Sequence, residues 1–391
     1  MKTKINALAK AIGAAVVLGS VSFASQAEIT LIKQDPQAGD PLSRLDFKVG
    51  GSIRPQINNM TGDGDKGSYK RNVFDGGTRF RFSADYYLFD DISWISYYEL
   101  GVNIPALFNW DNHYAKGATN TDRRMLYTGL KSATYGTLTY GKQNSIYYDV
   151  IGAKTDIWDY DMLAQAPGNG INGNYDGSYR SRSMLKYKNT FGDADLYAGY
   201  LFEDEPYRVN SNGVYSGYSY KRKGGGSLGV DYHITDDLTW GTAWNLTRAV
   251  VYQNSARSEG KTYNQSIYGT ALSWTPDNWT LSAGGGYYQN YLVTKRAPKT
   301  PGNYFAGDAW GVEYFAGYKF PIGKYMVKSI QPYFMGDRLE YLSGTNYKRI
   351  DNGLGISFQL DYGFRIDYEH VFTSSTDDQG DMNVVRVRYD F

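Results

Sequence analysis

Residues that could support acid–base or nucleophilic chemistry are few in this sequence. It has no cysteine, and its three histidines are His113, His233 and His370. A catalytic nucleophile or base needs a partner group placed beside it. None of the three histidines shares a predicted strand face with serine and aspartate side chains at a spacing that would place such partners beside it. Without cysteine there are no disulfides and no cysteine-ligated zinc. The sequence therefore predicts no enzyme, no metal site and no cofactor.

Arginines recur instead at every second position of otherwise apolar segments. In VVRVRYDF (384–391), Val385, Val387, Tyr389 and Phe391 share one parity, while Arg386, Arg388 and Asp390 share the other. The same alternation is found in FRIDYEH (364–370) and RFRFSADY (79–86). Period-2 alternation is typical of a strand with one apolar and one polar face. The chemistry that such arginines offer is electrostatic, because a row of them creates a field in the water beside it.

The first residues read as an export signal. Lys2, Lys4 and Lys10 precede an apolar run at 11–24, and Ser25-Gln26-Ala27 gives a small-x-small cleavage site. A membrane-spanning helix needs about 20 apolar residues, and this run is shorter. We therefore expect a signal peptide at 1–27 and a mature domain at 28–391. An exported chain of this kind is a soluble periplasmic protein, a secreted protein or a transmembrane β-barrel.

Two features favour the barrel. Aromatic residues lie near strand ends, as in the girdles at the two membrane interfaces: Trp240, Trp244, Trp274, Trp279, Trp310, Phe320 and Phe391. Short turns such as 89–91 and 234–237 also alternate with long loops such as 144–179. The pattern predicts an all-β, transmembrane antiparallel barrel of sixteen strands. A barrel of this size encloses an aqueous channel.

A barrel in lipid must close, because every backbone polar group needs a partner. The last strand then pairs with LDFKVGGSIR (45–54), and the polar faces of neighbouring strands share one sector of the channel wall. We predict that this sector is lined by Lys48, Arg54, Arg79, Arg81, Arg124, Arg180, Arg182, Lys186, Lys188, Arg365, Arg386 and Arg388. The alternative is that these residues are ordinary charged side chains on a solvent-exposed surface.

The longest predicted loop, 144–179, is rich in acids and aromatic residues. Its carboxylates include Asp149, Asp156, Asp159 and Asp161. If the loop folds inward, Asp156, Asp159 and Asp161 face the arginines and constrict the pore, as charged rings do in channels. The alternative is a solvated external loop.

The segment DRRMLYTGLKSATYGTLTYGKQNSIYYDVIGAKTD (122–156) resembles the run that enters the inward-folded third long loop of enterobacterial trimeric general porins. Residues 78–100 and 183–200 resemble two other hairpins of that family. By local match the family's wall arginines correspond to Arg79 and Arg124, and a third to Arg180 or Arg182. The loop departs from the family's Pro-Glu-Phe-Gly-Gly motif, since WDYDMLAQ stands in its place.

The resemblance implies an outer-membrane porin for passive diffusion of small hydrophilic solutes and ions. It also implies a homotrimer and a terminal strand, ending in Phe391, that is read by the barrel-assembly machinery. Outer-membrane lipid and lipopolysaccharide are then its surroundings. A porin selective for sugars or acidic oligosaccharides is the first alternative, and an adhesin or phage receptor is the second. The 41 basic and 40 acidic residues give no reason to expect nucleic acid.

Overall fold

The computed structural model describes residues 28–61, 72–108, 121–157, 173–211, 214–253, 260–290, 307–344, 346–376 and 380–391. The predicted signal peptide at 1–27 lies outside these residues. None of the helices in the described ranges is long and apolar enough to cross a membrane.

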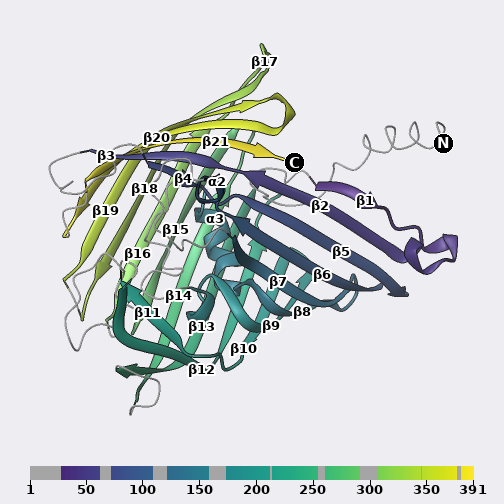
Figure 1. The fold of residues 1–391 in the computed structure, drawn as a ribbon, viewed down its shortest axis with the longest axis horizontal. Coiled ribbons are helices and arrows are strands. Elements are labelled where there is room, and N and C mark those ends of the chain that lie inside the picture. The colour runs from purple at the N-terminus through teal and green to yellow at the C-terminus, as the bar shows by residue number, and fades with distance from the viewer. Residues whose placement is uncertain are drawn as a thin grey trace.

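Within these ranges the chain forms a closed antiparallel barrel of sixteen wall strands, as the alternation predicted (Figure 1). The first wall strand is β2 (Leu45–Ile53) continued by β3 (Pro55–Thr61). The others are β5 (Arg79–Phe89), β6 (Ile92–Val102), β7 (Thr121–Ser132), β8 (Gly136–Asn144), β9 (Arg180–Phe191), β10 (Ala194–Leu201), β12 (Val214–His233), β13 (Leu238–Gln253), β14 (Gly260–Trp274), β15 (Trp279–Gln289), β16 (Ala309–Tyr318), β18 (Val327–Tyr341), β19 (Lys348–Leu360), β20 (Phe364–Ser375) and β21 (Asp381–Asp390).

Four shorter strands extend the wall and belong to hairpins or edges. β1 (Glu28–Ile32) pairs with β2, β4 (Asn72–Asp75) with β3, β11 (Tyr207–Ser211) with β12, and β17 (Phe320–Lys324) with β18. The helical segments are short: η2 (Pro36–Ala38), η3 (Pro41–Arg44), α2 (Ile104–Phe108), η4 (Tyr148–Gly152), α3 (Ala153–Thr155), α4 (Gly173–Asp176) and η5 (Asp361–Gly363).

The barrel closes where β21 meets the first wall strand. Asp390 lies opposite Ser52, and the backbones of Phe391 and Gly51 exchange two hydrogen bonds. Farther along, β21 pairs with β3 from Asp381 opposite Thr61 to Arg386 opposite Gln56. No wall strand is left with an unpaired edge at this junction, as a membrane barrel requires.

Side-chain exposure separates an apolar outer face from a polar inner face. On β21, Val385 and Val387 are 40% and 42% exposed, whereas Arg386 and Arg388 are 4% and 8% exposed. The tryptophans of the predicted girdles that lie on β13, β14 and β15 are also exposed on the outer face: Trp240, Trp244, Trp274 and Trp279. The parity of β21 therefore places Arg386 and Arg388 inward and its valines outward.

The start of the long loop lies inside the barrel, where η4 and α3 are surrounded by strands (Figure 1). Ile146, Tyr147, Val150 and Ile151 are at most 1% exposed. They rest on inward glycines of neighbouring strands, where a Cβ atom would come within 3 Å of the loop. These glycines are Gly229 on β12, Gly241 on β13 and Gly269 on β14. The inward fold predicted for this loop is confirmed for its described beginning.

Candidate functional site

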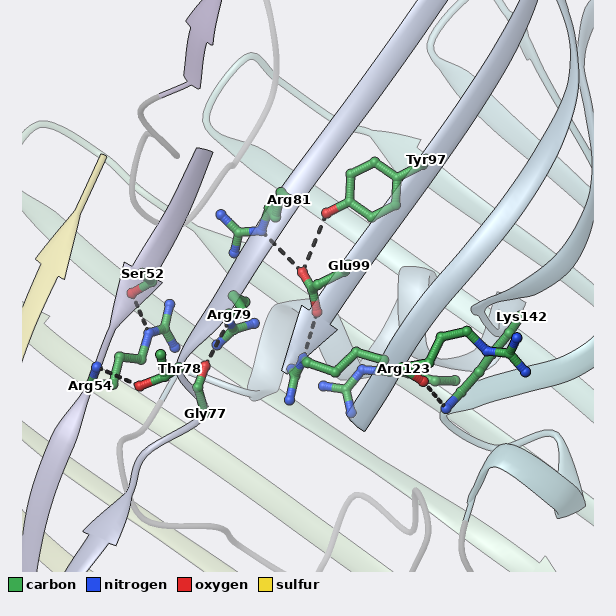
Figure 2. A network of polar contacts seen from close by, with 12 residues as sticks. Ser52, Arg54, Gly77, Thr78, Arg79, Arg81, Tyr97, Glu99, Arg123 and Lys142 are labelled. Carbon is green, nitrogen blue, oxygen red and sulfur yellow. Dashed lines mark hydrogen bonds and ion pairs between the residues drawn. The ribbon is translucent and has the colours of Figure 1, made fainter. Parts of the chain in front are cut away.

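One carboxylate on β6 holds two arginines of the inner wall. Arg81 lies opposite Glu99 in the register, and its Nε is 3.0 Å from Glu99 Oε2. A bulge in the β6–β7 pairing at Glu99 turns Arg124 toward the same carboxylate, with its Nε 2.5 Å from Oε1. The Tyr97 hydroxyl donates a third hydrogen bond to Oε2. Figure 2 shows Arg81, Tyr97 and Glu99 converging from neighbouring strands.

Two neighbouring arginines have only neutral partners. Arg54 donates from Nε to Ser52 Oγ at 2.6 Å, and its backbone N–H donates to Thr78 Oγ1. Arg79 donates from Nε to the Gly77 carbonyl at 2.9 Å. In the part of the chain that the structure describes, neither guanidinium lies within ion-pair distance of a carboxylate. Figure 2 shows Arg54 and Arg79 on either side of Gly77 and Thr78.

The turn between them is fixed by Asp75, at the end of β4. Its carboxylate accepts hydrogen bonds from the backbone N–H groups of Gly77 and Thr78. The acid is therefore occupied by its own turn, and it positions the backbone against which Arg79 rests.

Arg180 and Arg182 have different surroundings, although the sequence left both open as the third wall arginine. The Arg180 guanidinium lies 4.0 Å from the centre of the Tyr179 ring, and Arg180 is among the charges that act most strongly on Arg79. Arg182 lies over the Tyr175 ring and forms an ion pair with Asp204 at 3.4 Å. Arg180 is thus the one that joins the group around Arg79.

The predicted arginines of the last two strands also lie on the inner face. Arg365 is paired with Asp367 on β20, and Arg388 with Asp390 on β21, each at 2.7 Å. Arg386 lies opposite Asp367 in the register. Arg365 and Arg388 are therefore each paired with an aspartate two residues along the same strand. This spacing is visible in the sequence, but the predicted site did not include the two aspartates.

The loop acids in the described residues are bound to partners other than these arginines. Asp156 accepts a hydrogen bond from the Tyr148 hydroxyl at 2.6 Å. Asp149 forms an ion pair with Lys186 at 2.6 Å, and Lys154 of the loop forms one with Asp231 at 2.7 Å. Asp159 and Asp161 lie outside the described residues. The two ion pairs attach the start of the loop to β9 and β12.

The far end of the loop is anchored through Asp176. Its carboxylate accepts hydrogen bonds from the Ser178 backbone N–H and hydroxyl, and its carbonyl accepts one from Thr247 on β13. Complete burial raises the pKa of Asp176 to about 6, against the opposing effect of the Ser178 hydrogen bonds. The loop is therefore attached to the wall at both described ends.

The site predicted from the sequence did not include a group of acidic residues on another sector of the inner wall. Glu313 on β16 lies opposite Asp337 on β18, which lies opposite Asp351 on β19. All three are at most 2% exposed, and Asp351 is paired with Arg349 at 2.6 Å. The same period-2 parity that identified the arginines places these acids inward, so the sequence carried a signal for them.

The described histidines lie apart from any catalytic arrangement. His233 is 3.7 Å from Asp195, and His370 contacts the side-chain oxygen of Asn383. His113 lies outside the described residues. In those residues no cluster of histidine and carboxylate side chains has the geometry to hold a metal ion.

Comparison with known proteins gives consistent results. A family model described as Gram-negative porin matches residues 14–326. Outer membrane porin C 2 of Shigella flexneri serotype 5a is 26% identical over 344 residues, covering 83% of this chain and 84% of that protein.

Two solved structures share the fold. The Salmonella typhi OmpF complex with daunomycin has a TM-score of 0.63 at 16% identity, covering 89% of this chain and 97% of that one. The anion-selective porin from Comamonas acidovorans has a TM-score of 0.61 at 12% identity, covering 89% and 100%.

Proposed function

Because the chain belongs to the family of Gram-negative porins, we propose that the inward arginines give its channel a preference for anions. The protein is a porin of the outer membrane, forming a β-barrel channel. Small hydrophilic solutes and ions diffuse through it, and the wall charges decide which of them pass more easily.

The observation that carries this proposal is the imbalance around Glu99. Five arginines gather on this sector of the inner wall: Arg54, Arg79, Arg81, Arg124 and Arg180. Among the described residues the only carboxylate in ion-pair contact with any of the five is Glu99, which serves Arg81 and Arg124. A cleft lined by one sign of charge concentrates ions of the opposite sign. The excess of guanidinium groups therefore favours anions.

We propose two further properties of the protein. It acts as a channel and not as an enzyme, since the chemistry that its wall supports is electrostatic. It assembles as a homotrimer, which is supported by the resemblance of residues 78–200 to trimeric porins. The mass of the detergent-solubilised protein, measured by light scattering, would contradict the trimer if it equalled that of one chain.

Selectivity for sugars is the alternative. It rests on Trp158 and Tyr160, whose rings could stack on sugar faces, and both lie outside the described residues. The described geometry supports charge-dependent diffusion instead.

Planar-bilayer recording in a salt gradient tests the proposal. The wild-type channel is expected to show a reversal potential on the anion-selective side, and Arg79→Gln combined with Arg124→Gln should move it toward cations. Arg248→Gln is the matched control, because Arg248 lies on a wall strand but is exposed on the outer face. An unchanged reversal potential in the double variant would refute the role of the arginines, while absence of any conductance would refute the channel itself.

A further inference from the structure

Three arginines lie directly opposite one another where the barrel closes. Arg365 on β20 pairs with Arg388 on β21. Across the next interface Ile53 lies opposite Tyr389 and Gln56 opposite Arg386, so the unbroken register sets Arg54 opposite Arg388. Side chains directly opposite in an antiparallel pair have Cβ atoms about 5 Å apart, and like charges there are destabilising. We call Arg54, Arg365, Arg386 and Arg388 the seam arginines.

Counter-charges compensate this row only in part. Arg365 and Arg388 each form an ion pair with the aspartate two residues along, Asp367 and Asp390. Arg54 has no such partner among the described residues: Gln56 stands two residues along its strand, and Ser52, two residues before it, accepts a hydrogen bond from its Nε. The charges that act most strongly on Arg54 are those of three arginines, Arg79, Arg388 and Arg386, and of one acid, Asp390.

The neighbouring rows of the seam do not remove this excess. On one side Asp367 lies opposite Arg386, which lies opposite Gln56. On the other side Asp390 lies opposite Ser52, which lies opposite Arg79. The three rows together contain five arginines and two acids, an excess of three positive charges. Arg54, only 8% exposed, lies at the centre of this excess.

From this arrangement we propose that the seam arginines bind a tetrahedral oxyanion of the phosphate type. The inference rests on the proposed porin function, and it adds a ligand class and a site distinct from the arginines held by Glu99. A guanidinium binds phosphate oxygens through a planar fork of N–H donors. The Nε of Arg54 is held by Ser52, which orients the group and leaves its remaining N–H groups for a ligand.

Gly76, in the turn beside the seam arginines, has no side chain that would crowd Arg386. A Cβ atom on Gly76 would come within 2.7 Å of Gln56 Oε1 and 3.3 Å of Arg386 Nε. A glycine here keeps the space next to Arg386 free of a side chain. Because a doubly charged anion offsets more of the excess than chloride does, phosphate should be retained in preference to chloride.

The test is the block of chloride current by inorganic phosphate in planar bilayers, recorded in dilute KCl so that screening is weak. For the wild-type channel the block should saturate with phosphate concentration. In Arg54→Gln the half-blocking concentration should rise about tenfold, since one charge-assisted hydrogen-bonding group is lost. Arg248→Gln, on the outer face, should leave it unchanged, and Arg54→Lys should fall between.

The outcomes separate this inference from the proposed function. A conducting wild-type channel without saturable phosphate block would overturn the seam site and leave the porin function standing. Equal block in Arg54→Gln and the wild type would also overturn it. Should Arg54→Gln fail to assemble, Arg388→Gln removes a second member of the row and should weaken the block in the same way. Loss of block on replacing Arg124 but not these residues would assign the anion to the Glu99 group instead.

Discussion

Glu99 is the residue whose contacts organise the basic wall most directly. Its carboxylate is 2% exposed and takes hydrogen bonds from Arg81, Arg124 and Tyr97. Removing one partner of a buried ion pair leaves a charge uncompensated, which is strongly destabilising. Here one substitution would leave two arginines without their acid.

Replacing this acid should change both selectivity and stability. In Glu99→Gln the wall loses the one carboxylate that pairs with Arg81 and Arg124 among the described residues, so the reversal potential should move further toward anions. The barrel should also lose about 3 kcal/mol of stability. Bilayer recording measures the first effect, and urea unfolding of the detergent-solubilised protein measures the second.

Glu205→Gln serves as the control, because Glu205 is exposed and outside this network. A reversal potential that moves toward cations in Glu99→Gln, or a urea midpoint equal to that of Glu205→Gln, would contradict the bridging role of Glu99.

For individual residues, the sequence predicted which face of a strand a side chain occupies better than it predicted the ion-pair partner of that side chain. Parity placed Arg365, Arg386 and Arg388 on the inner face, and the structure has them there. Parity does not show which carboxylate reaches which guanidinium, because that depends on bulges and register. The bulge at Glu99, which brings Arg124 to the same carboxylate as Arg81, has no signature in strand alternation.

The long loop is the element that shapes the channel interior. Its start lies against glycines on the inner wall, and Gly241 is the tightest contact with η4. A Cβ atom there would come within 2.7 Å of both Val150 Cγ1 and the Val150 carbonyl oxygen. Backbone cannot yield as a flexible side chain can, so the loop itself would have to move.

Gly241→Ala should therefore loosen the start of the loop. Overpacking of this kind costs about 1–3 kcal/mol, so local opening should become about tenfold more frequent. Hydrogen exchange at the Asp149 amide, which donates to the Ser145 carbonyl, should accelerate accordingly. Gly226→Ala is the matched control, because a Cβ there would meet nothing closer than 3.7 Å. Equal exchange rates in the two variants would show that the wall does not hold the loop.

The elements themselves were predictable because their signals are local. Alternation over several residues defines a wall strand, and short polar turns separate neighbouring strands. The positive φ of Ser183, at a register shift between β8 and β9, was not predictable. Sequence spacing alone could not choose between Arg180 and Arg182 either, because their surroundings differ through contacts with Tyr179 in one case and with Tyr175 and Asp204 in the other.

At the scale of the whole molecule, closure joins segments from the two ends of the barrel sequence. β2 and β3 pair with β21, which lies at the opposite end of the barrel sequence, and non-local pairing of this kind forms slowly. The junction is covered on its outer face by aromatic rings. Phe391 packs edge-on against Phe80 with ring centres 5.8 Å apart, and stacks on Tyr389 at 5.7 Å.

Gly51 is the residue that lets this aromatic cover lie flat on the wall. A Cβ atom there would come within 2.6 Å of the Phe391 ring and 2.7 Å of the Arg79 carbonyl oxygen. Gly51→Ala should therefore strain the junction by about 1–3 kcal/mol and lower the urea midpoint of the barrel. Gly226→Ala, inside an uninterrupted part of the wall, should keep the wild-type midpoint. Since Gly51 also exchanges backbone hydrogen bonds with Phe391, the strain falls on the contacts that complete the barrel, and refolding into lipid vesicles should slow as well. A Gly51→Ala variant with the wild-type midpoint and refolding rate would mean that the two ends meet without depending on this contact.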